Sequence, residues 1–254
     1  MSSLVEQKFG AAAADYAASS VHAHGPSLAR TIALVAPQSD WTVLDVATGA
    51  GHTALAFAPL VKSVLATDVT QEMLEQARSL AAERGLSNFE TARMDAAALS
   101  AADETFHLVT CRLAAHHFPD PAAFVDEAWR VLVPGGTFAL VDNISPDQSA
   151  ESMAYNIFET LRDPSHVRCL ALGEWLALLQ TKAFTDPRSE VLDQDIAFDP
   201  WVARMRCDAG AVVALRAMLA REPLHTLLNP RTADDGDVFT LKEAIIVVRK
   251  GARA

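Results

Sequence analysis

A glycine-rich turn at residues 48–51 is the part of the sequence best suited to bind a ligand. Gly49 and Gly51 follow the apolar stretch TVLDVAT and precede the alanine-rich stretch HTALAFAPLV. Glycine lets the backbone turn tightly and approach a ligand closely, and the amide groups at the start of the following helix then face it. The spacing G-x-G-x-x-A is weak evidence alone, but a strand before it and a helix after it indicate a nucleotide-type site.

Two carboxylates near this turn narrow the identity of the ligand. Asp68 ends a second apolar stretch about twenty residues beyond the first glycine, where an acid can bond the hydroxyls of a ribose. Asp45, four residues before Gly49, would repel the pyrophosphate of NAD and attract a cationic amino-acid group. These residues favour S-adenosylmethionine as the cofactor, with an NAD-dependent oxidoreductase as the less favoured alternative.

The pattern D-x-x-x-G-x-G, formed by Asp45, Gly49 and Gly51, resembles that of the class I S-adenosylmethionine-dependent methyltransferases. Within that family the chain is most similar to the ubiquinone and menaquinone C-methyltransferase-like group, methyltransferase type 11. The stretches that carry this likeness are TDVTQEML, MDA and CRLAAHHFPDPAAFVDEAWRVLVPGGTFALVD, and the resemblance covers residues 40–145 well.

The resemblance implies a row of cofactor contacts at successive strand ends. It assigns the turn to the methionine end, Asp68 to the ribose and Asp95 to the adenine amino group. An alternative for Asp95 is the N-cap of a helix over AAALS. The resemblance implies these cofactor-binding residues: Asp45, Thr48, Gly49, Gly51, Asp68, Val69, Met73, Asp95, Ala96, Cys111, Arg112 and Leu113.

The implied reaction is an in-line displacement at a sulfonium methyl group, which asks the protein mainly to hold donor and acceptor together in a dry site. A general base is needed only if the acceptor must lose a proton. His116 and His117 are the candidates, because they follow a strand at the carboxyl edge of the sheet. The alternative is that one histidine caps the next helix and the other packs in the core.

The methyl acceptor is predicted to be a small molecule. An apolar stripe at Met153, Ile157, Phe158 and Leu161 suggests a hydrophobic or aromatic acceptor, although the same stripe could dock a lid. No metal is expected, since Asp142 and Asn143 lack the third carboxylate that a magnesium site would need. A protein that binds the cofactor without methylating is a further alternative.

The elements that must position these residues alternate between strand and helix. Such alternation predicts a single α/β domain over residues 1–254 with a Rossmann-like, mostly parallel, seven-stranded sheet, helices on both faces and small helical cap insertions. N-terminal helices are expected in residues 1–36, the cofactor-binding core in 37–145, and the caps in 146–170 and 199–236. Strands are predicted at residues 42–48, 63–69, 88–95, 106–112, 137–143, 189–198 and 243–250, and helices at 71–85, 121–133, 152–161, 173–184 and within 200–221.

Charge and composition limit the partners of this chain. A formal net charge of −11 argues against nucleic acid or an anionic membrane surface, because both require a dense cationic patch. No apolar run reaches 18 residues, and no basic-then-apolar leader is seen, so a cytoplasmic protein is expected. Three widely spaced cysteines predict free thiols. The oligomeric state stays open, a homodimer included.

Overall fold

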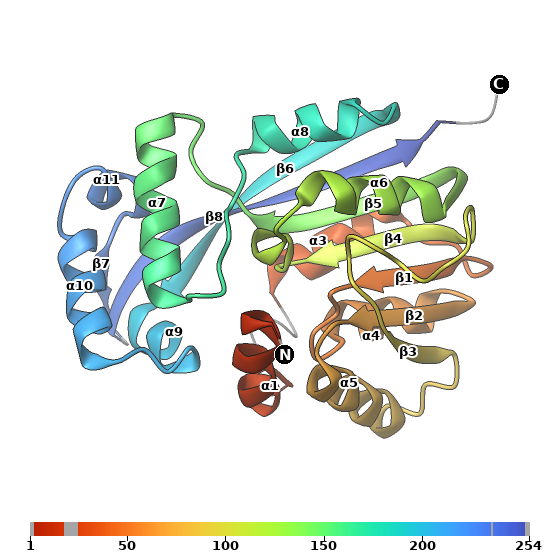
Figure 1. Ribbon diagram of the computed structural model, residues 1–254, viewed down its shortest axis with the longest axis horizontal. Helices are drawn as coiled ribbons and strands as arrows, with labels where there is room; N and C mark the ends of the chain where they lie inside the picture. The colour runs from red at the N-terminus through yellow and green to blue at the C-terminus, as the bar shows by residue number, and fades with distance from the viewer. Residues whose placement is uncertain (1–2, 18–24, 235, 252–254) are drawn as a thin grey trace.

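The computed structural model describes residues 3–17, 25–234 and 236–251, and these form one central sheet with helices on both faces (Figure 1). The strands follow the order β3-β2-β1-β4-β5-β8-β6, with the short β7 paired to β8. The strands are β1 (Thr42–Val46), β2 (Ser63–Asp68), β3 (Phe89–Arg93), β4 (Phe106–Arg112), β5 (Leu132–Asn143), β6 (Phe184–Ala197), β7 (Arg231–Ala233) and β8 (Gly236–Lys250).

Pairing within the sheet is parallel from β3 to β5, whereas β8 lies antiparallel to both of its long neighbours, β5 and β6. The predicted Rossmann-like, mostly parallel α/β fold is confirmed. In a parallel sheet, every strand delivers its carboxyl end to the same edge, and ligands of open α/β sheets bind there. The topology therefore brings the ends of β1, β2 and β4 to one edge.

The helices divide between the two faces of the sheet and the cap at one end of it (Figure 1). Two N-terminal helices are present as predicted, and the segment between them, residues 18–24, lies outside the described residues. The helices are α1 (Leu4–Ala17), α3 (Pro26–Val35), α4 (His52–Phe57), α5 (Gln71–Glu83), α6 (Pro121–Val131), α7 (Ser149–Arg162), α8 (Leu172–Gln180), α9 (Phe198–Arg204), α10 (Ala209–Leu219) and α11 (Leu224–Leu228).

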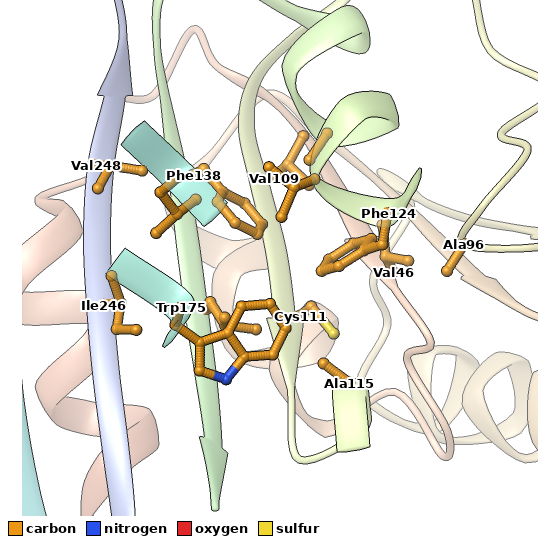
Figure 2. Close-up of a cluster of buried hydrophobic side chains, with 14 of the residues drawn as sticks. Val46, Ala96, Val109, Cys111, Ala115, Phe124, Phe138, Trp175, Ile246 and Val248 are labelled. Atoms are coloured by element: carbon orange, nitrogen blue, oxygen red, sulfur yellow. The ribbon is translucent and has the colours of Figure 1, made fainter. Parts of the chain in front are cut away.

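Two hydrophobic clusters lie on opposite faces of the sheet. One contains Phe124 of α6 and Trp175 of α8 packed over strand residues that include Phe138 and Cys111 (Figure 2). The other contains Val35 of α3 together with side chains of α4. Burial on both faces explains why the central strands are short, continuous apolar runs.

A third cluster joins α7, α9, α10 and α11 to the first half of β8. Its centre is aromatic, with the Phe158 ring stacked on Trp201 at 5.2 Å and Phe239 edge-on to Trp201 at 4.9 Å. These elements therefore pack around a cluster distinct from the two that cover the sheet (Figure 1).

Several predicted boundaries were wrong, and Pro134-Gly135-Gly136 explains the clearest case. A helix was predicted over 121–133, directly before this stretch, but α6 ends at Val131 and the three residues lie inside β5. Gly135 has a φ of +77°, and the pairing register with β4 shifts between Phe106 and Leu108. An irregular strand segment therefore replaces the expected turn. Other differences are the early start of β8 at Gly236, the unpredicted β7, and the division of 200–221 between α9 and α10.

No described helix is long and apolar enough to cross a membrane.

Candidate active site

The turn after β1 has two glycines with different structural roles. Both have positive φ, +53° at Gly49 and +87° at Gly51, a conformation that L side chains rarely adopt. A Cβ on Gly51 would lie 2.8 Å from Cβ of Ala77 on α5, whereas one on Gly49 would meet no atom within 4 Å. Gly51 thus permits close packing of α5, and Gly49 faces open space beside the turn.

Asp45 lies beneath this turn and is almost fully buried. Its carboxylate accepts hydrogen bonds from the hydroxyls of Thr48 (2.5 Å) and Thr110 (2.6 Å). Burial raises the pKa of Asp45 to about 6, although both hydrogen bonds and the charge of Arg112 act in the opposite direction. Asp45 does not line the cavity that lies beside this turn, and it instead holds Thr48 in place through their hydrogen bond.

Asp68, at the end of β2, links two turns at the edge of the sheet. One carboxylate oxygen accepts from the backbone amide of Gly49 at 2.9 Å, and the other from that of Thr70 at 2.8 Å. Burial raises the pKa of Asp68, while these backbone hydrogen bonds lower it. Unlike Asp45, this carboxylate lines the cavity, so its remaining lone pairs face the space where a ligand would lie.

A first cavity of about 270 Å³ opens beside these strand ends. Ten of the predicted site residues line it: Thr48, Gly49, Asp68, Val69, Met73, Asp95, Ala96, Arg112, Leu113 and His117. The structure therefore brings together residues from four strand ends that span 70 positions of sequence, from 48 to 117.

Four predicted site residues do not line this cavity. Asp45 and Gly51 support the turn, and His116 lines a different cavity described below. Cys111 belongs to the hydrophobic cluster under α6, where burial raises the pKa of its thiol well above the ordinary value (Figure 2). Its side chain therefore faces away from the cavity that its neighbours Arg112 and Leu113 line.

Asp95 occupies an exposed turn at the rim of the first cavity. Its carboxylate accepts from the backbone amide of Ala97 at 2.9 Å, and residues 96–100 form a turn and bridge instead of a helix. The alternative in which Asp95 caps a helix is therefore wrong. Among the described residues, its other carboxylate oxygen has no hydrogen-bond partner that would compete with a ligand at the rim.

The N-terminal helix supplies lining residues that the sequence did not predict. Val5 and Phe9 of α1 line the first cavity, and the Phe9 ring packs edge-on against His117 at 5.0 Å. The position of α1 is fixed from two sides, because Glu6 pairs with Arg93 at 2.5 Å and Arg206 of the cap donates to the carbonyl of Ala11 at 2.9 Å. Amphipathic spacing predicted this helix but could not predict what it covers.

His116 forms a buried pair with Asp142 at the end of β5. Its Nδ1 lies 2.6 Å from Oδ1 of Asp142, and its backbone amide donates to Oδ2 at 2.8 Å. Burial lowers the pKa of His116, but the charge and the hydrogen bond of Asp142 more than offset this, so the pKa stands above its usual value. Asp142, considered above as a magnesium ligand, is therefore engaged by the histidine.

His117 has a different electrostatic environment from its neighbour. Its Nδ1 lies 3.0 Å from the carbonyl oxygen of Ser165, which requires a proton on Nδ1. Burial and then the charge of His116 lower the pKa of His117 to about 3, so the ring is neutral near pH 7. Neither histidine caps α6, because Asp120 does so by accepting from Ala123. The capping alternative is therefore wrong.

A second cavity of about 270 Å³ adjoins the first and shares Phe9, Arg112, Leu113 and His117 with it. His116, Asn143, Gln194 and Glu243 contribute polar groups to its wall, and Ile196, Trp201 and Leu241 contribute apolar ones.

The apolar stripe predicted for the acceptor lies elsewhere. Met153 and Ile157 of α7 are 65% and 54% exposed, and Phe158 packs inside the third hydrophobic cluster, which α7 forms with α9, α10, α11 and β8. None of the three is among the residues that line the second cavity. Its apolar wall comes instead from Trp201 on α9 and from side chains of β6 and β8, a combination that no local sequence pattern predicts.

Comparison with known proteins gives consistent similarities. The family described as "Methyltransferase domain" matches residues 44–140. The chain is 38% identical over 199 residues to the uncharacterized methyltransferase YcgJ of Bacillus subtilis, covering 78% of this chain and 79% of that protein. The crystal structure of YcgJ superposes with a TM-score of 0.85 at 33% identity, covering 91% of this chain and all of that one.

The chain is also similar to a member of the ubiquinone and menaquinone C-methyltransferase-like group. The chain is 30% identical over 143 residues to the ubiquinone/menaquinone biosynthesis C-methyltransferase UbiE of Zymomonas mobilis, covering 56% of this chain and 59% of that protein. The similarity to YcgJ covers a much larger share of the chain than residues 44–140, which the family matches.

Proposed function

The chain belongs to the class I S-adenosylmethionine-dependent methyltransferases, and on this premise we propose that its second cavity receives a small-molecule acceptor of aromatic or hydrophobic character. The observation that carries the proposal is the junction of the two cavities at Phe9, Arg112, Leu113 and His117. A cofactor in one cavity and an acceptor in the other would meet there. Membership of this family sets aside the NAD-dependent alternative.

The first cavity has groups that suit S-adenosylmethionine. The Asp68 carboxylate, held by two backbone amides, would accept hydrogen bonds from the ribose hydroxyls. Val69 and Met73 would contact the adenine, with Asp95 and the backbone amide of Ala96 at its polar edge. The open space above Gly49 leaves room for a close backbone approach. These roles are proposals that the geometry supports.

Asp45 would act on the cofactor through the protein. The sequence favoured a direct attraction between its charge and the amino-acid end of the cofactor, but Thr48 and Thr110 take both carboxylate oxygens. Thr48 itself lines the cavity. We therefore assign Asp45 to positioning Thr48 and the turn, and Thr48 to the contact.

When bound, S-adenosylmethionine supplies an electrophilic methyl group on a positively charged sulfur. The residues of this chain would hold the acceptor in line with it and exclude water, which accounts for much of the acceleration in such reactions. Phe9 and Leu113 give the junction apolar walls. Together with Val5, also on α1, they would keep water away from the reacting atoms.

His116 is the residue we propose as general base where the acceptor must lose a proton. Asp142 engages Nδ1 of the ring, so Nε2 is the atom available to take a proton from the acceptor. Asp142 would orient the imidazole and stabilise the charge that develops on it. His117 would stay neutral, because its pKa is too low for protonation near pH 7.

Two measurements test this proposal. Transfer of a labelled methyl group from S-adenosylmethionine to a panel of phenols, quinols, amines and thiols should yield a labelled small molecule. S-adenosylhomocysteine should raise the melting temperature, because a ligand that binds only the folded state stabilises it. Stabilisation without any labelled product across the panel would favour the non-methylating alternative and count against the proposal.

A variant pair makes the cofactor assignment specific. Asp68→Ala should weaken S-adenosylhomocysteine at least tenfold, since hydrogen bonds to a charged group contribute about 1.5–3 kcal/mol. Glu75→Ala, on an exposed position of α5, is the matched control and should bind as the parent does. Equal affinity in the two variants would show that Asp68 does not hold the cofactor.

A further inference from the structure

Two buried polar atoms, on residues that line the second cavity, have no hydrogen-bond partner among the described residues. They are Oε1 of Glu243, on a residue only 5% exposed, and Nε2 of Gln194. Both residues line the cavity. One atom is a hydrogen-bond acceptor and the other a donor, so the cavity holds a complementary pair of unsatisfied groups.

The two side chains come from neighbouring strands and point to the same face of the sheet. In the β6–β8 register, Leu192 lies opposite Glu243, and Gln194 lies opposite Leu241. Glu243 and Gln194 are therefore diagonal neighbours, a relation in which the residues lie about 7–8 Å apart. Two side chains in this relation can hydrogen-bond to two different atoms of one ligand.

The charges around the pair favour a neutral ligand. The Glu243 carboxylate accepts a hydrogen bond from Ser27 and would repel a ligand carboxylate. Arg112 interacts electrostatically with Glu243, and Arg162 and Arg204 also line the cavity, so a cationic ligand would meet three guanidinium groups. Asp195, another lining residue, is paired with Arg231. A group that is uncharged and carries both a donor and an acceptor avoids both penalties.

We propose that the second cavity selects an uncharged acceptor that carries a carboxamide, whose N–H donates to Oε1 of Glu243 and whose carbonyl accepts from Nε2 of Gln194. This inference rests on the proposed function, because it takes the second cavity as the acceptor site. His116, the proposed general base, lines the same cavity. The substrate class is then a small aromatic or hydrophobic amide with a second, nucleophilic group.

Three matched probes test the inference by calorimetry on the full chain saturated with S-adenosylhomocysteine. They are 3-hydroxybenzamide, its N,N-dimethyl derivative and 3-hydroxybenzoate. The amide should bind at least tenfold more tightly than the dimethylamide, which lacks the donor, and than the benzoate, which is anionic. Equal affinity of the amide and the dimethylamide, or tighter binding of the benzoate, would overturn the inference.

Two variants then separate the two contacts. Glu243→Leu should remove the preference for the amide over the dimethylamide. Gln194→Leu should weaken the binding of both the amide and the dimethylamide and leave the ratio of their affinities unchanged. Asp193→Asn is the control, because this exposed neighbour of Gln194 points to the opposite face and pairs with Lys242. The ratio of two affinities within one variant does not depend on how much of the protein is folded.

The test distinguishes failure of this inference from failure of the proposed function. If S-adenosylhomocysteine binds and none of the three probes does, the amide assignment is wrong while the cofactor site stands. If S-adenosylhomocysteine itself fails to bind, the proposed function is refuted first. A Glu243→Leu variant that retains the full preference for the amide would also overturn the inference.

Discussion

Replacing Asp142 by asparagine tests the charge coupling on which His116 depends. The substitution keeps the shape of the side chain and one oxygen to accept from the His116 amide, but it removes the negative charge beside Nδ1. Burial alone lowers the pKa of His116, and Asp142 is the main cause of its net rise. The variant should therefore leave a histidine whose pKa lies below its ordinary value.

The size of the effect follows from the contact. A hydrogen bond to a charged group contributes about 1.5–3 kcal/mol, which corresponds to a fall in the pKa of His116 of about one to two units. Methyl transfer to an acceptor that must lose a proton should slow by about tenfold to a hundredfold, since a general base contributes 10²–10⁴-fold. The acidic limb of the pH–rate profile should move to lower pH, because the weaker base stays unprotonated further into acid.

Stability should change with pH in a defined direction. A histidine whose folded-state pKa is raised stabilises the protein below its unfolded-state pKa, and that contribution disappears as pH rises through the folded-state value. Asp142→Asn should therefore lower the free energy of unfolding by about 2 kcal/mol more at pH 5.5 than at pH 9. Denaturant titration at the two pH values measures the difference.

The direct assay is NMR titration of the histidine ring signals, with that of His116 assigned by its loss in His116→Asn. Asp163→Asn is the matched control. Asp163 is also a buried carboxylate, but the histidine that it approaches, at 3.9 Å, is His117 and not His116. It should move the pKa of His116 much less. A His116 pKa that is unchanged by Asp142→Asn would refute the reasoning.

Two further substitutions test the turn after β1. Gly51→Ala should lower the free energy of unfolding by about 3 kcal/mol and Gly85→Ala by only about 1 kcal/mol, because both impose left-handed strain but only Gly51 would also clash, with Ala77. Denaturant titration compares them, and equal losses would contradict the packing role of Gly51. From pH 4 to pH 8, the free energy of unfolding of Asp45→Asn should rise by about 2 kcal/mol relative to that of the parent. The reason is that the pKa of the buried Asp45 is raised to about 6, so ionisation of this residue destabilises the parent as pH rises, whereas an asparagine does not ionise. A difference between parent and variant that stays constant with pH would show that Asp45 is not penalised by burial.

The sequence predicted the parts of the site that depend on short-range order. The turn at Gly49 and the carboxylate of Asp68 belong to consecutive strand–turn–helix units, and parallel strands bring their ends to one edge. The local pattern also identified His116 and His117 as following a strand at that edge. It could not reveal that Asp142, 26 residues further on, would face His116, because that depends on β4 and β5 lying side by side.

The second cavity could not be predicted from the sequence for a related reason. Glu243 and Gln194 are 49 positions apart, and their meeting depends on the antiparallel register between β6 and β8. Trp201 reaches the same cavity from a cap helix. Periodicity in Met153 and Ile157 pointed to a different surface, since an amphipathic stripe shows that a face is apolar without showing what covers it.

The acids at three strand ends show how one edge of a sheet can hold several negative charges close together. Each is buried, and each has different partners: two threonine hydroxyls for Asp45, two backbone amides for Asp68 and a histidine for Asp142. Since a buried charge is tolerated only when it is paired or hydrogen-bonded, the partner of each carboxylate determines its role. Both carboxylate oxygens of Asp45 are hydrogen-bonded within the protein, and Asp142 is paired with His116. Asp68 is the one of the three that lines the first cavity, so its replacement should weaken ligand binding, whereas replacing the other two should chiefly alter stability and the pKa of His116.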